Sequence, residues 1–490
     1  MSEVAVRSES RRWLVLSIFC LQSGLVGVLW ITFAPIASLS SSFYGVSLGS
    51  ISLLSMVFMI LFLPGILLTS YLMTKWGLRR VVIIGSLLDL VATILRFISV
   101  FLPQKTGPLY PAFSVLLLGQ SFGALAQPLF ITVPVRLAND WFSRDERDAV
   151  TVIAAMVNPV GNALGQVVPP LVLSQYPTDK GLIKGFGWLL AGEGVVAVVA
   201  FLWACACFAE DPTTAPSRAT IVRRTSRQEL LQTLSQGRVS SPRVSSPSVG
   251  SRTASTDSTF SACDALRALK FDYSTLLKDK NYRILLVAFG MGLGLFNAIL
   301  TCIEQLVKPA NYNSDDAGLF GGVVLLTGLP VAGIVGVVLD RTHAYRATLK
   351  AGFAFAWMAV LVFLVLLRPA QRGLVCMGSA LLGATTTPML PVSMETAVEC
   401  TFPVPEEASG GLLLMAGQVF GVIFTLTLEN LLTSGGGSSF EGVWTSAAFF
   451  ILSVELAASM LVLCYRGQYK RHVSERSDHG TEASCRLAPS

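Results

Sequence analysis

Residues 238–247 read Arg-Val-Ser-Ser-Pro-Arg-Val-Ser-Ser-Pro and lie within a polar stretch that runs from Ala209 to Asn281. This stretch is rich in Ser, Arg, Thr and Pro, and it contains no apolar run long enough to cross a bilayer. Long hydrophobic segments lie on both sides of it. We therefore interpret it as a disordered cytosolic loop that connects two membrane-embedded halves. Its two Ser-Pro pairs fit either a phosphorylated switch or a plain solvated linker.

The composition is that of a membrane protein with many spans. Of the 490 residues, 52% are hydrophobic and 13% are charged, whereas a soluble domain carries about 25% charged residues. The small excess of Lys and Arg follows from the positive-inside rule, so binding to nucleic acid is not needed to explain it. The sequence contains no P-loop or HExxH motif and no histidine within an apolar run. We therefore expect neither an enzyme nor a metal site, and no cofactor.

The apolar runs predict twelve membrane helices, six before the polar stretch and six after it. They lie at 13–38, 50–73, 80–101, 110–135, 147–174, 186–208, 282–306, 316–339, 348–367, 373–400, 407–432 and 442–465. The expected fold class is an all-α membrane protein built from two six-helix bundles. Its expected parts are an N-terminal arm at 1–12, a first bundle at 13–208, the loop at 209–281, a second bundle at 282–465 and a tail at 466–490.

An even number of spans places both termini on the same side of the membrane. Basic residues are concentrated on that side, as illustrated by Arg7, Arg79, Arg136 and Lys470. The positive-inside rule therefore predicts that both termini and the polar loop are cytosolic. The expected location is the plasma membrane, with an internal or lysosomal membrane as the alternative.

The segment Gly336-Val-Val-Leu-Asp340-Arg341 falls between predicted spans 8 and 9. It resembles a turn that major facilitators carry at this position and between spans 2 and 3, which implies the major facilitator superfamily fold. In the first half Gly77 and the basic pair after it remain, but Thr74 stands where the family has Asp. We expect a cytosolic gate or motif set formed by Arg79, Arg136, Asp340, Arg341, Glu395 and Glu399. Arg79 fits a topology determinant equally well.

Polar side chains inside spans are costly, so each one is a candidate for function. Trp30 is expected in the middle of span 1, and Gln127 precedes Pro128 in span 4. Asn297 follows three glycines in span 7, which should bend the helix beside it, and Gln418 lies in span 11. Each of these residues could pack in the core or line a cavity.

Charged residues within the spans are candidates for ion coupling or for structural pairing. Asp89 and Arg96 are seven residues apart in span 3 and share a helix face, and they could pair through water. Glu193 lies in span 6, and Glu304 lies late in span 7.

Several segments resemble the FLVCR-related solute carriers (feline leukaemia virus subgroup C receptor family). The segments are Trp30-Ile-Thr-Phe-Ala-Pro, Glu395-Thr-Ala-Val-Glu399-Cys-Thr-Phe-Pro and Gly417-Gln418-Val-Phe-Gly. The resemblance implies a carrier of haem, of choline and ethanolamine, or of pyridoxine. In choline-transporting members, aromatic residues of spans 1 and 7 hold the cation beside glutamines. This pattern matches Trp30, Gln127 and Gln418, whereas Asn297 replaces the second aromatic and would weaken quaternary ammonium binding by ~1–2 kcal/mol.

We therefore expect a secondary or facilitative transporter that moves a small organic solute by alternating access of two bundles. The solute would be a choline- or ethanolamine-like amine or haem, and the protein would act as a monomer in the lipid bilayer. Two alternatives remain open from the sequence. One is a carrier of a pyridoxine-like vitamin, and the other is a non-transporting membrane receptor or scaffold whose loop binds partners.

Overall fold

The computed structural model describes residues 11–103, 110–143, 146–209, 273–342, 344–401, 404, 406–434 and 445–467. Most of the expected N-terminal arm, most of the polar loop with its Ser-Pro pairs, and most of the tail lie outside the described residues. The side chain of Asp340 also lies outside them, so its expected gating role has no structural description here.

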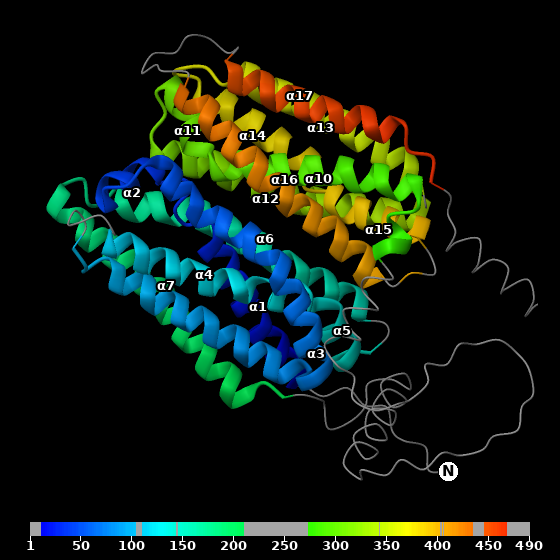
Figure 1. The fold of residues 1–490 in the computed structure, drawn as a ribbon, viewed down its shortest axis with the longest axis horizontal. Coiled ribbons are helices and arrows are strands. Elements are labelled where there is room, and N and C mark those ends of the chain that lie inside the picture. Colours follow the sequence, from blue (N-terminus) through cyan, green and yellow to red (C-terminus); the bar gives the residue numbers. More distant parts are fainter. Residues whose placement is uncertain are drawn as a thin grey trace, which may run out of the picture.

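The described chain consists of helices that form two bundles, one from each half of the sequence (Figure 1). The first half contains α1 (Arg11–Ile31), α2 (Ala37–Tyr44), α3 (Leu48–Ser99), α4 (Pro111–Ile131), α5 (Pro134–Trp141), α6 (Arg147–Leu173) and α7 (Asp179–Cys207). The second half contains α10 (Lys280–Thr301), α11 (Ile303–Val307), η1 (Lys308–Ala310), α12 (Ser314–Thr342), α13 (Tyr345–Leu366), α14 (Arg372–Thr386), α15 (Met389–Thr401), α16 (Glu406–Ser434) and α17 (Ser446–Leu463).

Twelve segments among the described residues are long and apolar enough to cross a membrane. Their outer faces carry large apolar side chains such as Trp188, Ile334 and Phe355, which are 68%, 62% and 65% exposed. Surfaces of this kind are stable against hydrocarbon, where helices satisfy their own backbone hydrogen bonds. The expected all-α membrane fold with twelve spans in two bundles is therefore confirmed.

Several helix boundaries differ from the expected ones. Span 1 was expected to run to residue 38, but α1 ends at Ile31 and a separate helix, α2, follows. The expected span 10 is divided between α14 and α15, because residues 387 and 388 form a turn before Met389. Expected spans 2 and 3 both lie in α3, and its backbone departs from helical geometry at Gly77, where φ is 79°. Glycine adopts this φ without steric cost.

The helix α10 continues without a break through Asn297 to Thr301, and the bend expected there stays a prediction. The nearby glycines provide close packing. A Cβ added to Gly290 would lie 2.9 Å from Cδ2 of Phe420, and one added to Gly294 would lie 2.6 Å from the Cβ of Phe420. Small residues at these positions allow α10 and α16 to approach closely. The helix ends later, at Thr301, and Cys302 separates it from α11, which begins at Ile303.

The first bundle depends on a similar close approach between α1 and α6. A Cβ on Gly161 of α6 would collide with the backbone carbonyl of Gly24 in α1. Asn158, one turn earlier on α6, donates a hydrogen bond of 3.0 Å from its Nδ2 to the carbonyl oxygen of Ser23. The amide therefore fixes the register of two helices that only glycine allows to touch.

We predict that Gly161→Ala lowers the free energy of unfolding by about 1–3 kcal/mol, because the added methyl group overpacks a backbone contact. Gly192→Ala is the matched control, since a Cβ at Gly192 meets no atom within 4 Å. The measurement is thermal unfolding of the detergent-purified variants. Equal melting temperatures for the two variants would show that the α1–α6 contact is not constrained.

Candidate functional site

Trp30 lies at the end of α1 rather than in the middle of a span. It is the penultimate residue of that helix and is 6% exposed. Its carbonyl oxygen accepts a hydrogen bond of 3.2 Å from Oγ of Ser55 in α3. The expected mid-span position is corrected, because the chain leaves the helix at residues 32–36 before α2 begins. The indole is nevertheless enclosed by protein.

A short chain of contacts leads from Trp30 to the second bundle. Met59 lies one turn after Ser55 on α3 and reaches α16, where a Cβ on Gly421 would lie 2.9 Å from Sδ of Met59. The same Cβ would lie 3.7 Å from the Cβ and the Nδ2 of Asn297 in α10. Asn297 is therefore positioned where helices of the two halves meet. Met59 lies between it and Ser55, the residue that bonds to Trp30.

The other two expected binding residues lie on helices that border this region. Gln127 is on α4 and is 7% exposed, and Gln418 is half-buried on α16, one turn before Gly421. Within the described chain, the side-chain amides of Gln127, Asn297 and Gln418 have no hydrogen-bond partner. Three unbonded amides near the contact between bundles are costly unless water or a ligand satisfies them.

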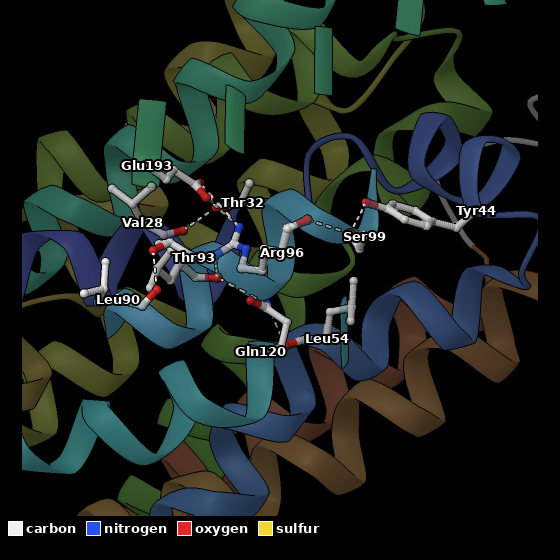
Figure 2. Close-up of polar contacts among 11 residues, drawn as sticks. Val28, Thr32, Tyr44, Leu54, Leu90, Thr93, Arg96, Ser99, Gln120 and Glu193 are labelled. Atoms are coloured by element: carbon white, nitrogen blue, oxygen red, sulfur yellow. Dashed lines mark hydrogen bonds and ion pairs between the residues drawn. The ribbon is translucent and has the colours of Figure 1, made fainter. Parts of the chain in front are cut away.

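A buried ion pair lies in the first bundle, close to the end of α1 (Figure 2). Arg96 of α3 is fully buried, and its Nη2 lies 3.0 Å from Oε2 of Glu193 in α7. Thr32 donates a hydrogen bond of 2.9 Å to the other oxygen of Glu193. The guanidinium also lies 5.1 Å from the ring centroid of Phe33. The pair therefore holds α3, α7 and the segment after α1 together.

Further polar contacts surround this pair. Gln120 of α4 donates from Nε2 to the carbonyl oxygens of Leu29 and Leu54, at 3.3 and 3.1 Å. Ser99 donates to the carbonyl oxygen of Arg96 at 2.6 Å, and its hydroxyl lies 3.0 Å from that of Tyr44 in α2. Figure 2 shows these residues converging from α1, α2, α3, α4 and α7 or the segment that follows α1. We call this cluster the brace, because it fixes the end of α1, where Trp30 lies, against α3, α4 and α7.

The sequence suggested that Asp89 and Arg96 could pair, but the partner of Arg96 is Glu193. Glu193 lies almost a hundred residues after Arg96 in the sequence. Sequence spacing predicts contacts along one helix, so it could not identify this partner. Asp89 is fully buried, and within the described residues neither of its oxygens has a hydrogen-bond partner. Of the expected coupling residues, the structure thus pairs Arg96 with Glu193 and leaves Asp89 separate.

Glu304 joins the two halves at the end of the molecule where α1 finishes and α10 finishes. Its Oε2 accepts a hydrogen bond of 2.7 Å from the backbone N–H of Ser38, at the start of α2. Its Oε1 accepts one of 3.0 Å from the hydroxyl of Ser314 in the second half. Burial raises the pKa of the Glu304 carboxyl, and the hydrogen bonds from Ser38 and Ser314 oppose that rise.

Two neighbours of Glu304 strengthen the same junction. Lys308 donates from Nζ to Oγ of Ser38 at 2.9 Å, and Gln305 donates from Nε2 to Oγ of Ser52 at 3.2 Å. Sequence reasoning did not single out Ser38, because its role rests on a backbone N–H that carries no sequence signal. We call Ser38, Ser52, Glu304, Gln305 and Lys308 the inter-bundle junction.

The expected gate residues lie at the opposite end. Arg79 donates to the carbonyl oxygen of Cys205 at 3.5 Å, and Arg136 donates to that of Met73 at 3.4 Å. Both contacts are within the first bundle. Glu395 is exposed and Glu399 is buried on α15, and Arg341 is exposed at the end of α12. The structure therefore places these residues at one end of the molecule, and their joint action as a gate stays a prediction.

Two bundles of membrane-spanning helices, one from each half of the chain, are an architecture typical of membrane transport proteins. A model of the Major Facilitator Superfamily matches residues 14–399, and the chain belongs to that family. The resemblance to the FLVCR-related carriers is also confirmed, and members of these families are transporters rather than enzymes.

Relatives match over most of the chain. Solute carrier family 49 member A3 of Xenopus tropicalis is 29% identical, covering 97% of this chain and 91% of the relative. The choline/ethanolamine transporter FLVCR2 of Homo sapiens is 28% identical, covering 88% and 74%. The xylose transporter XylE from E. coli, in a partially occluded inward-open conformation, aligns with a TM-score of 0.65 at 11% identity, covering 94% and 99%. That likeness establishes the fold alone.

We predict that Arg96→Met lowers the free energy of unfolding by about 3–5 kcal/mol, because it leaves Glu193 as an unpaired buried charge. The double variant Arg96→Met/Glu193→Leu should be more stable than the single variant, since it removes both charges. Thermal unfolding of the purified proteins measures this order, with the exposed Arg80→Met as control. A double variant that is less stable than Arg96→Met would show that the pair does not act as a unit.

We predict that Glu304→Ala opens the inter-bundle junction and exposes Cys302, which is fully buried beside it. Loss of hydrogen bonds to a carboxylate costs about 1.5–3 kcal/mol each, which should raise the rate of Cys302 labelling roughly tenfold or more. Labelling by a hydrophilic maleimide in detergent, read by peptide mass spectrometry, measures this rate. Asp315→Ala is the control, and equal labelling in both variants would contradict a closing role for Glu304.

Proposed function

We propose that this chain moves a small organic amine across the membrane through a site lined by Trp30, Gln127, Asn297 and Gln418. The observation that carries this proposal is the position of Asn297, which lies where α10 and α16 meet Met59 of α3 and has no side-chain hydrogen-bond partner among the described residues. A buried amide without partners is retained at a cost that ligand hydrogen bonds would offset. The site also draws on both halves, as transport by alternating access requires.

The side chains favour a primary ammonium over a quaternary one. The indole of Trp30 can attract the cation of either solute by its ring face, whereas a cage for a quaternary ammonium uses more than one ring. The amide oxygens accept N–H hydrogen bonds, which ethanolamine offers and choline lacks. The similarity to FLVCR2, a choline/ethanolamine transporter, supports this substrate class. We therefore favour an ethanolamine-like solute.

The two ends of the molecule would open in turn. The inter-bundle junction closes one end in this structure, through hydrogen bonds of Glu304, Gln305 and Lys308. The end that carries both termini would face the cytosol, in keeping with its basic residues, and Arg341 and Glu399 would contribute to closure there. We propose the plasma membrane as the location and a monomer as the working unit, with the polar loop as a linker between 13–208 and 282–465.

We predict that Trp30→Ala abolishes ethanolamine uptake into proteoliposomes, whereas Trp30→Phe retains part of it, because a phenyl face still attracts a cation. The variant Asn297→Tyr should shift preference toward choline by roughly tenfold, since it restores an aromatic wall worth ~1–2 kcal/mol. Competition between labelled ethanolamine and choline measures the ratio.

Melting temperature and reconstitution yield control for folding in this series. Leu118→Ala is the matched control, because Leu118 is exposed on the apolar outer face of α4. Unchanged uptake in Trp30→Ala would assign the indole to packing only. An Asn297→Tyr variant with an unaltered ratio of the two solutes would remove residue 297 from the binding site.

A further inference from the structure

Asp89 is a buried acid that the ion pair of the first bundle does not use. It is 0% exposed, and among the described residues neither carboxyl oxygen has a hydrogen-bond partner. A carboxylate in this setting would lose its hydration without compensation, which costs far more than an ordinary buried polar group. The position of Asp89 therefore calls for a bound counter-charge or a proton.

The packing of α3 on α4 shows what Asp89 faces. A Cβ on Gly119 of α4 would lie 3.1 Å from Cγ of Arg96. One turn further along α4, a Cβ on Gly123 would lie 3.6 Å from the Cβ of Ala92. Moving four residues forward along α4, from Gly119 to Gly123, corresponds to moving four residues back along α3, from Arg96 to Ala92. The two helices therefore pack as a regular antiparallel pair.

The same register continues past Asp89. A Cβ on Gly85 of α3 would lie 2.7 Å from Cζ of Phe130 in α4. Asp89 lies one turn from Gly85 and shares its helix face. It therefore faces the turn of α4 formed by Ala126 and Gln127. Gln127 belongs to the proposed solute site, so the buried acid borders that site from within the first bundle.

The third helix at this level is α1, and it brings a second unsatisfied group. The ring of Phe19 lies 6.2 Å from that of Phe130, and the carbonyl oxygen of Leu29 accepts from Gln120. Gln22 is one turn after Phe19 and so lies at the level of the aspartate. It is 0% exposed, and within the described chain both polar atoms of its amide lack a partner.

The charges around Asp89 do not neutralise it. On its own helix the acting charge is Arg96, which Glu193 of α7 already balances at 3.0 Å. The membrane helix α4 contains no ionisable side chain, and α1 carries Arg11 and Arg12 only at its start. One positive charge is therefore needed to balance the carboxylate of Asp89. It is supplied either by a proton on Asp89 or by a cation nearby.

We propose that Asp89 binds a proton when the solute site is empty and releases it when an ammonium solute occupies the site, so that transport is an exchange of solute for proton. The inference rests on the proposed function for the identity of the solute. In the empty state a proton from water forms an O–H bond on the carboxyl group, which is then neutral. When the ammonium binds beside Gln127, its charge stabilises the carboxylate, the O–H bond breaks and the proton passes to water.

The first experiment reads the proton directly and needs no substrate. Infrared spectra of the full chain in detergent near neutral pH should contain the carbonyl band of a protonated carboxyl group that is missing from Asp89→Asn. This variant mimics the neutral acid in shape, so its melting temperature should match that of the parent chain. A difference spectrum without such a band would overturn the proposal, whether or not any solute is transported.

The second experiment tests exchange, with labelled ethanolamine and protein-containing vesicles. An acidic vesicle interior should accelerate initial uptake by the parent chain and by Asp89→Glu. In Asp89→Asn, uptake should fall to the rate seen without a gradient and lose its pH dependence. Protein-free vesicles correct for passive distribution of the amine, and Glu455→Gln, a buried acid of α17, is the matched control.

The outcomes separate the two proposals. If the band is present but Asp89→Asn responds to the gradient as the parent chain does, exchange through Asp89 is overturned. Acceleration by an acidic exterior instead would also overturn exchange, because it would mean that proton and solute move together. If the parent chain moves neither ethanolamine nor choline, the proposed function fails, and the infrared band alone decides whether Asp89 holds a proton.

Discussion

Hydrocarbon offers no hydrogen bonds, so each polar group inside this molecule must find its partner within the protein or in a bound ligand. The first bundle meets this constraint with the fully buried pair of Arg96 and Glu193, whose remaining contacts reach Thr32 and the carbonyl oxygen of Leu29. These contacts fix the chain where α1 ends, and hence the indole of Trp30. The same contacts leave Nε of Arg96 and Oε1 of Gln120 without a hydrogen-bond partner among the described residues.

The sequence determined the architecture because hydrophobic length is a strong signal. Twelve apolar runs, a polar middle and one Gly-x-x-x-Asp-Arg turn were enough to predict the fold. Local features of the same kind were read less well. The glycines before Asn297 were interpreted as the cause of a bend. In the structure Gly290 and Gly294 pack against Phe420, which lies more than a hundred residues away in the sequence. The early end of α1 at Ile31 has a local cause that was passed over, because Pro35 lacks the N–H that would continue the helix.

The candidate site was predicted as a set of residue types but not as a geometry. Trp30, Gln127, Asn297 and Gln418 were identified as polar or aromatic groups in apolar runs, and such groups are conspicuous in any membrane sequence. Their relation to one another depends on the register of α3 against α1, α4 and α16, which no spacing rule supplies. Gln22 was overlooked although it has the same signal. Its importance appears only when its level on α1 is compared with that of Asp89 on α3.

The inter-bundle junction and the brace around Arg96 are built differently, and this difference bears on how the protein works. At the inter-bundle junction, Glu304 accepts hydrogen bonds from both halves, and Lys308 and Gln305 add two more across the same interface. These contacts use single side chains and a backbone N–H, so they can break one at a time without unfolding either bundle. The brace around Arg96 lies within one bundle and involves several helices at once. A rigid brace beside a separable junction lets a bundle move as a body, carrying Trp30 and Asp89 with it while their distance from each other is kept.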